Sequence, residues 1–227
     1  MIHFLKNRLK LRDPVSGLLH LLAALLSIIG AIWLLHGIGI NPSRTVWHFL
    51  AFSIFGISMF LLYVSSSLYH LLPLSERGVS ILRRIDHIMI YIFIAGTYTP
   101  ICLVALRARN IGEGWGMFAT VWALTLCGVA LKIFWLESAR WIRVALYFSM
   151  ASLGVVFAPA LYRALPTGAL VWLLVGAGIY GIGAIVYATK RPNPFPEVFG
   201  FHEIWHLFVM AASFCHLCAM KYYISVL

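Results

Sequence analysis

Seven long apolar stretches, separated by charged residues, dominate this chain and decide which folds are open to it. A helix needs roughly 20 residues, at 1.5 Å each, to cross about 30 Å of hydrocarbon. Each stretch meets or nearly meets that length, so the sequence predicts seven transmembrane helices. The last stretch reaches it only if its helix also takes in His202 and Glu203. The stretches cover residues 14–43, 45–75, 87–106, 114–131, 144–162, 164–189 and 204–220.

The composition agrees with a membrane location. Hydrophobic residues make up 62% of the chain and charged residues 11%, which is too apolar for a soluble core of ordinary size. A β-barrel is disfavoured because its strands would alternate polar and apolar residues. Connecting segments are short, so we expect one all-α domain over residues 1–227, a seven-helix membrane bundle. All four cysteines fall inside predicted spans, which argues against a disulfide framework.

The distribution of Lys and Arg predicts the orientation of this bundle. With a cytoplasmic N-terminus, the inner segments hold twelve of these cations and the outer segments five. The basic start followed by a long apolar run is interpreted as a retained signal anchor. The expected location is the bacterial inner membrane, with the C-terminus outside. The net charge of +10 follows from this topology, and no basic run is dense enough to indicate nucleic-acid binding.

Polar side chains from three predicted helices are expected at the same depth, near the cytoplasmic face. Ser66 and His70 come near the inner end of the second span, and Asp86 is the first or second residue of the third. His202 and His206 are one helical turn apart at the start of the seventh, so both rings face the same way. Three imidazoles and a water would complete the tetrahedral set of a catalytic zinc, with Asp86 supplying negative charge.

These residues and their neighbours also carry a resemblance to a known family. The runs Ser66–His70, Asp86–Tyr91 with Ala95–Pro100, and His202–His206 resemble the three signature motifs of the hemolysin III family. That family is the bacterial branch of the progestin and adipoQ receptors, which include the adiponectin receptors. The resemblance spans nearly the whole chain and implies a seven-helix bundle with a cytoplasmic N-terminus.

The resemblance also implies roles for individual residues. It assigns zinc binding to His70, His202 and His206, and contact with the water on the zinc to Asp86 and Ser66. Bacterial members commonly carry Glu, Asn and His before and within the first helix. In this chain Asp13, Ser16 and His20 occupy that spacing, which leaves the role of the first helix open. For His20, a hydrogen bond to the backbone near the helix end is favoured over a place in the cavity.

The function expected from these observations is zinc-dependent hydrolysis of a lipid amide or ester, ceramide-like by analogy with the family. Asp86 would accept a proton from water, and Ser66 would orient the water or the carboxylate. A site near the inner leaflet, enclosed by apolar helices, meets membrane lipids more readily than soluble substrates.

Three other functional classes remain open from the sequence. The run His202–His206 fits H-E-x-x-H, the zinc motif of metalloproteases, in which Glu203 would be the base. The protein could instead be a cytolysin, a pore or a membrane-homeostasis protein, although no ring of charges defines a conduction path. It could also be a receptor with a structural zinc, for which a fourth protein ligand would be the sign. A retinal protein is disfavoured because Lys221 lies at the outer end of the last span.

Two packing features complete the predictions. Pro100 and Pro159 lie within predicted spans and should kink them. The sixth span carries a run of small residues that is typical of close helix contact rather than of a ligand site. These small residues are Gly176, Ala177, Gly178, Gly181, Gly183 and Ala184.

Overall fold

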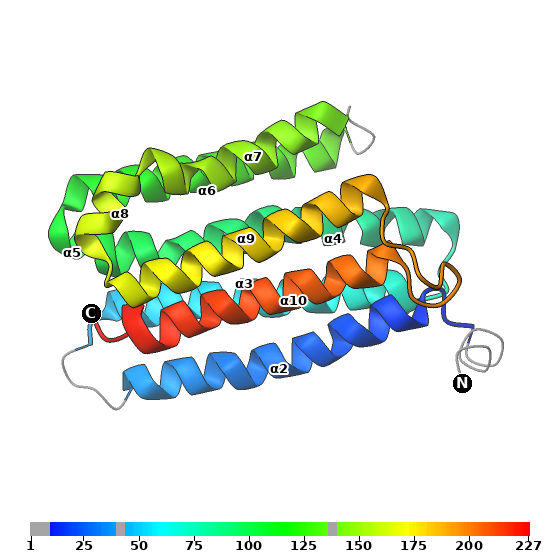
Figure 1. Ribbon diagram of the computed structural model, residues 1–227, viewed down its shortest axis with the longest axis horizontal. Helices are drawn as coiled ribbons and strands as arrows, with labels where there is room; N and C mark the ends of the chain where they lie inside the picture. The colour runs from blue at the N-terminus through cyan, green and yellow to red at the C-terminus, as the bar shows by residue number, and fades with distance from the viewer. Residues whose placement is uncertain (1–9, 40–43, 136–139) are drawn as a thin grey trace.

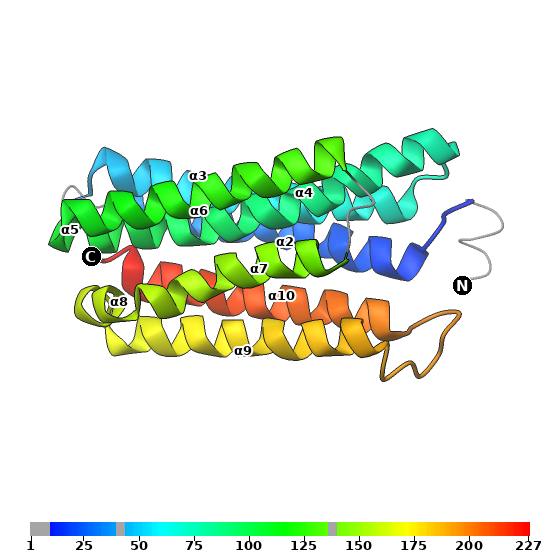
Figure 2. The ribbon, with the colours of Figure 1, turned by 90° about the horizontal axis from the view of Figure 1, so that it is seen from above.

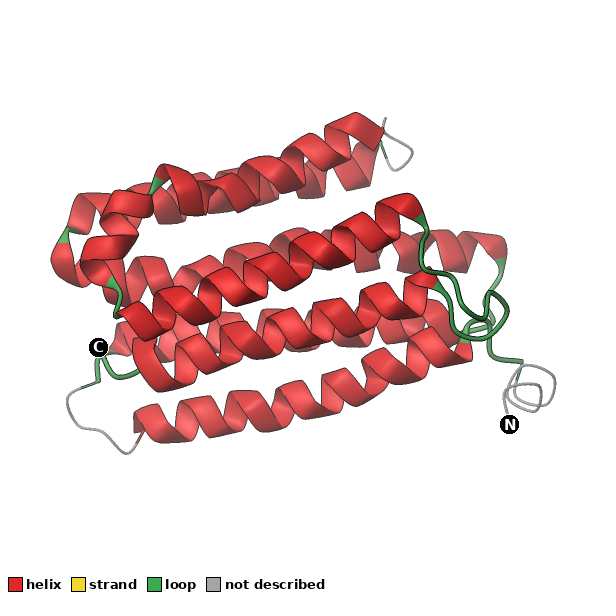
Figure 3. Ribbon diagram, in the orientation of Figure 1, coloured by secondary structure: helices red, strands yellow, loops and turns green. Residues whose placement is uncertain are grey.

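The computed structural model describes residues 10–39, 44–135 and 140–227, and it is helical (Figures 1 and 3). The helices run roughly along one long axis, with the start of α2 and the C-terminus at opposite ends (Figure 2). Lys6, Arg8 and positions 40–43 of the first apolar stretch lie outside the described residues. The prediction of an all-helical bundle is thus confirmed for the described residues.

Six helical segments in the described part of the chain are long and apolar enough to cross a membrane. The predicted spans 14–43, 45–75, 114–131 and 164–189 each correspond to one helix, and spans three and seven to composite helices that include π-helical turns. The segments are α2 (Pro14–Gly39), α3 (Val46–Leu71), α4 (Glu76–Pro100) with η1 (Ile101–Leu106) and α5 (Arg107–Arg109), α6 (Ile111–Phe134), α9 (Thr167–Thr189), and α10 (Phe201–Ala219) with η2 (Met220–Ile224).

The predicted fifth span, 144–162, is not one helix. It consists of α7 (Arg140–Val156) and the short α8 (Ala158–Ala164), and Phe157 interrupts the helix between them. Pro159 lies in the first turn of α8, where a missing backbone N–H is tolerated, so the chain restarts a helix there instead of kinking one. The 17 residues of α7 span only about 25 Å, and α7 is not among the six segments of the described chain that are long enough to cross a membrane.

Pro100 ends α4, and the π-helical segment η1 follows directly. A proline removes one backbone hydrogen bond and pushes away the preceding turn, and a widened turn accommodates this change. At Pro100 the structure thus shows a change of helix type, while the predicted kink stays a prediction.

The third span begins eleven residues earlier than expected. Ser75 caps α4, its side chain accepting a hydrogen bond from the N–H of Gly78, and Glu76 occupies the first turn. The helix therefore runs through polar residues before the apolar stretch begins, because helix propagation needs no apolar side chains. Asp86 is the eleventh residue of α4, so its placement as the first or second residue of the helix was wrong. The last helix, in contrast, begins at Phe201 and includes His202 and Glu203, as predicted.

The small residues of α9 divide into two groups. Gly176 and Gly183 face α10, and an added Cβ there would lie 2.6 Å from the ring of His216 and from Cβ of Phe208, respectively. Gly178 and Gly181 have nothing within 4 Å of an added Cβ. The predicted helix contact is thus confirmed for one face of α9. The four cysteines are free, as expected for residues within spans.

This division predicts opposite effects for two neighbouring substitutions. Gly183→Ala should lower the unfolding temperature in detergent, because the new methyl group forces α9 away from α10, at a cost of about 1–3 kcal/mol. Gly181→Ala adds the same methyl group where there is open space, so it should leave stability unchanged or raise it through better helix propensity. Thermal unfolding of both variants, followed by circular dichroism, checks this. Equal losses would contradict the packing described here.

Candidate metal centre

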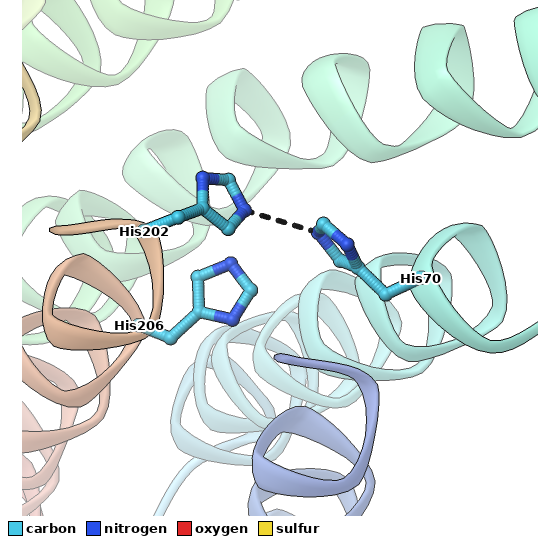
Figure 4. Close-up of side chains that lie close together, drawn as sticks. All are labelled: His70, His202 and His206. Carbon is cyan, nitrogen blue, oxygen red and sulfur yellow. Dashed lines mark hydrogen bonds between the residues drawn. The ribbon is translucent and has the colours of Figure 1, made fainter. Parts of the chain in front are cut away.

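Three histidine side chains meet at one end of the bundle (Figure 4). His70 comes from the last turn of α3, and His202 and His206 come from the first two turns of α10. One ligand nitrogen from each lies within 4.8 Å of the others, and Nε2 of His70 is 3.3 Å from Nε2 of His202. His70 and His206 are 4% and 3% exposed. The structure therefore brings together the three residues that the sequence predicted as ligands, as a group that could hold a metal ion.

Local structure explains why the rings meet. Since α10 begins at Phe201, His202 and His206 are one turn apart and project from the same face of the helix. The start of α2 is tied to the end of α3, because the N–H of Asp13 donates to the carbonyl of His70 over 2.9 Å. The start of α2 and the end of α3 are thus held at one level in the bundle.

Asp13 orients the His70 ring. One carboxylate oxygen of Asp13 lies 3.3 Å from Nδ1 of His70. This hydrogen bond, with the nearby Arg12 guanidinium, holds the pKa of Asp13 below its usual value, against partial burial that would raise it. An ionised carboxylate only accepts hydrogen bonds, so Nδ1 of His70 donates and Nε2 presents its lone pair toward His202. Metal-binding histidines are typically fixed in this way.

The residues fit a tetrahedral metal with nitrogen ligands. Two nitrogens at 2.0–2.1 Å from a tetrahedral zinc are separated by about 3.3 Å, which matches the separation of the two Nε2 atoms of His70 and His202. His70 and His206 are buried, whereas His202 is partly exposed and lines the neighbouring pocket. His206 is close enough to the other two rings to complete three ligands. Within the described part of the chain, no further His, Cys, Asp or Glu belongs to this group.

The first helix contributes more to the site than the sequence indicated. His20 is 4% exposed and stacks on His206, with ring centroids 3.8 Å apart and an angle of 13° between the planes. Neither ring nitrogen of His20 has a hydrogen-bond partner among the described residues, so the expected backbone hydrogen bond was wrong. The spacing in the sequence could have indicated this contribution, because Asp13, Ser16 and His20 follow the i, i+3, i+7 pattern of residues on one helix face.

Glu203 links α10 to α2 and caps its own helix. One carboxylate oxygen accepts the N–H of Gly200 over 2.8 Å, and the other accepts the Ser16 hydroxyl over 2.5 Å. Both oxygens are therefore engaged in structural hydrogen bonds, as in a capping box. In this arrangement Glu203 holds the histidine-bearing turn of α10 against α2.

A pocket of about 480 Å³ opens beside the histidines. Asp86 of α4 lines it together with His70 and His202, and the Ser66 hydroxyl is hydrogen-bonded to the Asp86 carboxylate. All five predicted site residues thus lie in or next to one region. Its other walls come from α2, α4, α9 and the loop 190–200. The remaining lining residues are Asp13, Ser16, Tyr69, Arg83, His87, Tyr187, Asn193, Pro196, Gly200, Phe201 and Glu203.

Comparison with known proteins places this arrangement in a family. The family model described as "Haemolysin-III related" matches residues 9–217. The chain is 34% identical to "Hemolysin-3 homolog" of Bacillus subtilis over 94% of its length and 95% of that protein's length. It is also 34% identical to "Hemolysin-3" of Bacillus cereus, over 99% of this chain and 94% of that protein.

A more distant similarity reaches animal proteins. The human "Monocyte to macrophage differentiation factor" is 27% identical over 80% of this chain and 74% of its own length. The family model and the two Bacillus proteins match nearly the whole chain, and six of its helical segments are apolar enough to cross a membrane. The chain belongs to the haemolysin-III related family, as a multi-pass protein of the bacterial inner membrane.

Proposed function

We propose that the protein is a zinc-dependent intramembrane hydrolase that cleaves an amide or ester bond in a membrane lipid of the ceramide type. The observation that carries this proposal is the convergence of three imidazoles beside a pocket that Asp86 also lines. Histidine nitrogens suit zinc, and three protein ligands leave a coordination position open for chemistry. The ceramide-like substrate rests on analogy with the family.

The residues of the site have separate roles in this proposal. His70, His202 and His206 hold the ion, and Asp13 keeps His70 in the tautomer that binds it. Zinc, when bound, supplies a Lewis acid that polarises a carbonyl oxygen and makes water a stronger acid.

Asp86 accepts the proton of the attacking water and later returns it to the leaving amine or alcohol. The Ser66 hydroxyl donates to the Asp86 carboxylate and keeps it oriented toward the pocket.

The membrane topology belongs to the same proposal. We place the N-terminus in the cytoplasm and the C-terminus outside, with α7 and α8 together forming the fifth of seven spans. The start of α4 and the ends of α6 and α9 lie at the same end of the bundle as the end of α3 and the start of α10 (Figure 1). In or next to these segments the sequence has Arg77, Arg83, Lys132 and Lys190. An inner face rich in cations is what the positive-inside rule expects, and it supports a site near the inner leaflet, where lipid head groups could reach it. A reporter fused to the C-terminus, active only outside, tests this orientation.

The experiment that tests the function measures metal and activity on the same preparation. Protein purified in detergent should contain one zinc per chain and hydrolyse a ceramide-type lipid in vesicles. A chelator should remove both the metal and the activity, and added zinc should restore both. A protein that binds no zinc, or that hydrolyses lipid equally well after chelation, overturns the proposal.

The Glu203→Gln variant separates this function from a metalloprotease. Glutamine keeps an oxygen that can accept the N–H of Gly200, so the cap of α10 should survive and lipid hydrolysis should fall by less than about 10-fold. A protease that uses Glu203 as its base would lose about 10²- to 10⁴-fold in rate. Casein and a lipid substrate, assayed in parallel with the wild type, distinguish the two. Loss of all activity with zinc still bound would favour the protease.

The pore and receptor alternatives give different results. The relative from Bacillus cereus is named "Hemolysin-3". If this protein lyses membranes as a pore, liposome leakage should persist when all three histidines are replaced. A receptor with a structural zinc would need a fourth protein ligand, and three side chains form the group in the described residues.

A further inference from the structure

Asn193 lies in the loop 190–200, which joins α9 to α10, and it lines the pocket beside the histidines. Its side-chain oxygen, Oδ1, accepts the backbone N–H of Phe201 over 3.2 Å, and Phe201 is the first residue of α10. The proposed hydrolysis assigns this side chain no step. The pocket therefore has a polar wall residue whose role is not yet explained.

The fold of the loop sets the position of this side chain. Phe195 and Phe199 exchange two backbone hydrogen bonds, of 3.1 and 2.7 Å, which close the turn between them. Pro194 restricts the residue before it, Asn193, to extended backbone conformations. Gly200 makes room for the amide, because an added Cβ there would collide with Oδ1 of Asn193. The amide is thus packed against the start of α10.

The hydrogen bond to Phe201 determines which end of the amide is left for a ligand. A backbone N–H needs an acceptor, and in a side-chain amide only the oxygen accepts, whereas the nitrogen carries two N–H donors. Oδ1 therefore contacts the backbone of α10. Nδ2 has no hydrogen-bond partner among the residues that the structure describes. The polar atom that Asn193 has available for a ligand is thus a donor.

Asn193 lies at the rim of the pocket. It is exposed, whereas His70, which lines the same pocket, is only 4% exposed. A lipid keeps its polar end toward water, because burial of polar groups among apolar helices without hydrogen bonds is unfavourable. The part of a lipid that we expect next to Asn193 is therefore its head group.

We propose that Nδ2 of Asn193 donates a hydrogen bond to a head-group oxygen of the lipid in the pocket, and that Asn193 thereby selects lipids that carry such an oxygen beside the bond that is cleaved. In a ceramide-type lipid this oxygen belongs to the primary hydroxyl group. Asn193 then has two functions, because Oδ1 caps the helix that carries His202 and Nδ2 binds the ligand. The ceramide-type ligand rests on the proposed function.

Two lipid probes test the donor. The first is a ceramide-type lipid whose primary hydroxyl is methylated, because an ether oxygen accepts hydrogen bonds and cannot donate them. The second is the deoxy analogue, which lacks this oxygen. In vesicles, the zinc-loaded wild type should have a KM for the deoxy lipid about 10- to 100-fold above that for the ether, as for an unpaired hydrogen-bonding group. Equal KM values in the wild type overturn the proposal, whichever variants fold.

Asn193→Asp removes the donor and keeps the helix cap. The carboxylate still accepts the N–H of Phe201, and a negative charge is favourable at a helix N-terminus, so the unfolding temperature should be unchanged or higher. Without an N–H at this position, the preference for the ether over the deoxy lipid should disappear. Asn193→Ala should also lose the preference, but at a lower unfolding temperature, because it removes the cap as well. A full preference in a folded Asn193→Asp overturns the role of Asn193.

The matched control is Asn110→Asp, at the other end of the bundle. Oδ1 of Asn110 accepts the N–H groups of Gly112 and Glu113 over 2.9 and 3.2 Å, so this asparagine also caps a helix, α6. Asn110 does not line the pocket. The same exchange of amide for carboxylate should therefore leave the preference for the ether as in the wild type. An equal loss in both variants overturns the ligand contact, because the effect would then not depend on the pocket.

Binding measurements separate this inference from the proposed function. The affinities of the two lipids for the protein in nanodiscs give the preference without hydrolysis. If the wild type binds the ether more tightly and hydrolyses neither lipid, the hydrolase proposal fails and the contact with Asn193 stands. If it hydrolyses both lipids with equal KM, the hydrolase proposal stands and the contact is wrong. A wild type that binds neither lipid overturns both.

Discussion

Replacing His206 with alanine is expected to lower the zinc affinity of the purified protein by at least about 100-fold. Loss of a residue that merely supports a metal ligand typically costs 10–100-fold in affinity, so loss of a ligand itself should cost at least as much. His206 is 3% exposed and stacks on His20, so water enters the vacated position poorly and cannot fully replace the imidazole. Titration with a zinc-selective chelator as competitor measures the change.

The matched control for this variant is His216→Gln, in the same helix. His216 lies ten residues further along α10, about 15 Å along the helix axis, and packs against Gly176 of α9. The His216→Gln substitution removes an imidazole that does not contact the candidate site, so the zinc affinity should stay within a few-fold of the wild type. If His206→Ala bound zinc as tightly as the wild type, the three-histidine centre would be wrong. Equal losses in both variants would indicate general unfolding instead.

Replacing Asp86 with asparagine is expected to lower kcat for lipid hydrolysis by about 10²- to 10⁴-fold, with zinc still bound. A general base contributes a rate factor of that size, and an amide cannot accept the proton of the attacking water. Asparagine has nearly the same shape as aspartate and can still accept the hydrogen bond of Ser66, so the pocket should keep its form. Steady-state kinetics and metal analysis on the same sample give the two values.

Ser66→Ala provides the comparison for the Asp86 variant. The Ser66 hydroxyl orients the Asp86 carboxylate and does not itself take the proton, so its loss should cost about 10-fold in rate and leave zinc content unchanged. Wild-type hydrolysis rates in Asp86→Asn would exclude Asp86 as the base. Loss of zinc in that variant would assign Asp86 to metal binding instead.

Most of the helices could be predicted because apolar length is a local property of the chain. The last span is an example. Its apolar stretch alone is too short to cross the hydrocarbon, so the prediction extended the helix back to His202, and the helix does include that residue. Helix boundaries that do not depend on apolar length were harder to predict. The helix that carries Asp86 begins in polar residues at Glu76, and the segment around Pro159 divides into two helices.

The site could be predicted in part, for a similar reason. His202 and His206 are one turn apart in sequence, so their shared direction follows from helix geometry alone. Their meeting with His70, which precedes His202 by 132 residues, could only be inferred from matched depth in the membrane and from the family motifs, and the structure places them together.

The sequence by itself determined that this chain is an apolar helical bundle, and it identified three histidines at one depth, because helix period and hydrocarbon thickness act on neighbouring residues. Only the tertiary structure decided that Asp13 orients His70 and that His20 stacks on His206. Those contacts depend on how each helix is rotated about its axis and how closely it approaches the next. Rotation and approach are set by side-chain packing between distant segments, and spacing along one helix does not contain that information.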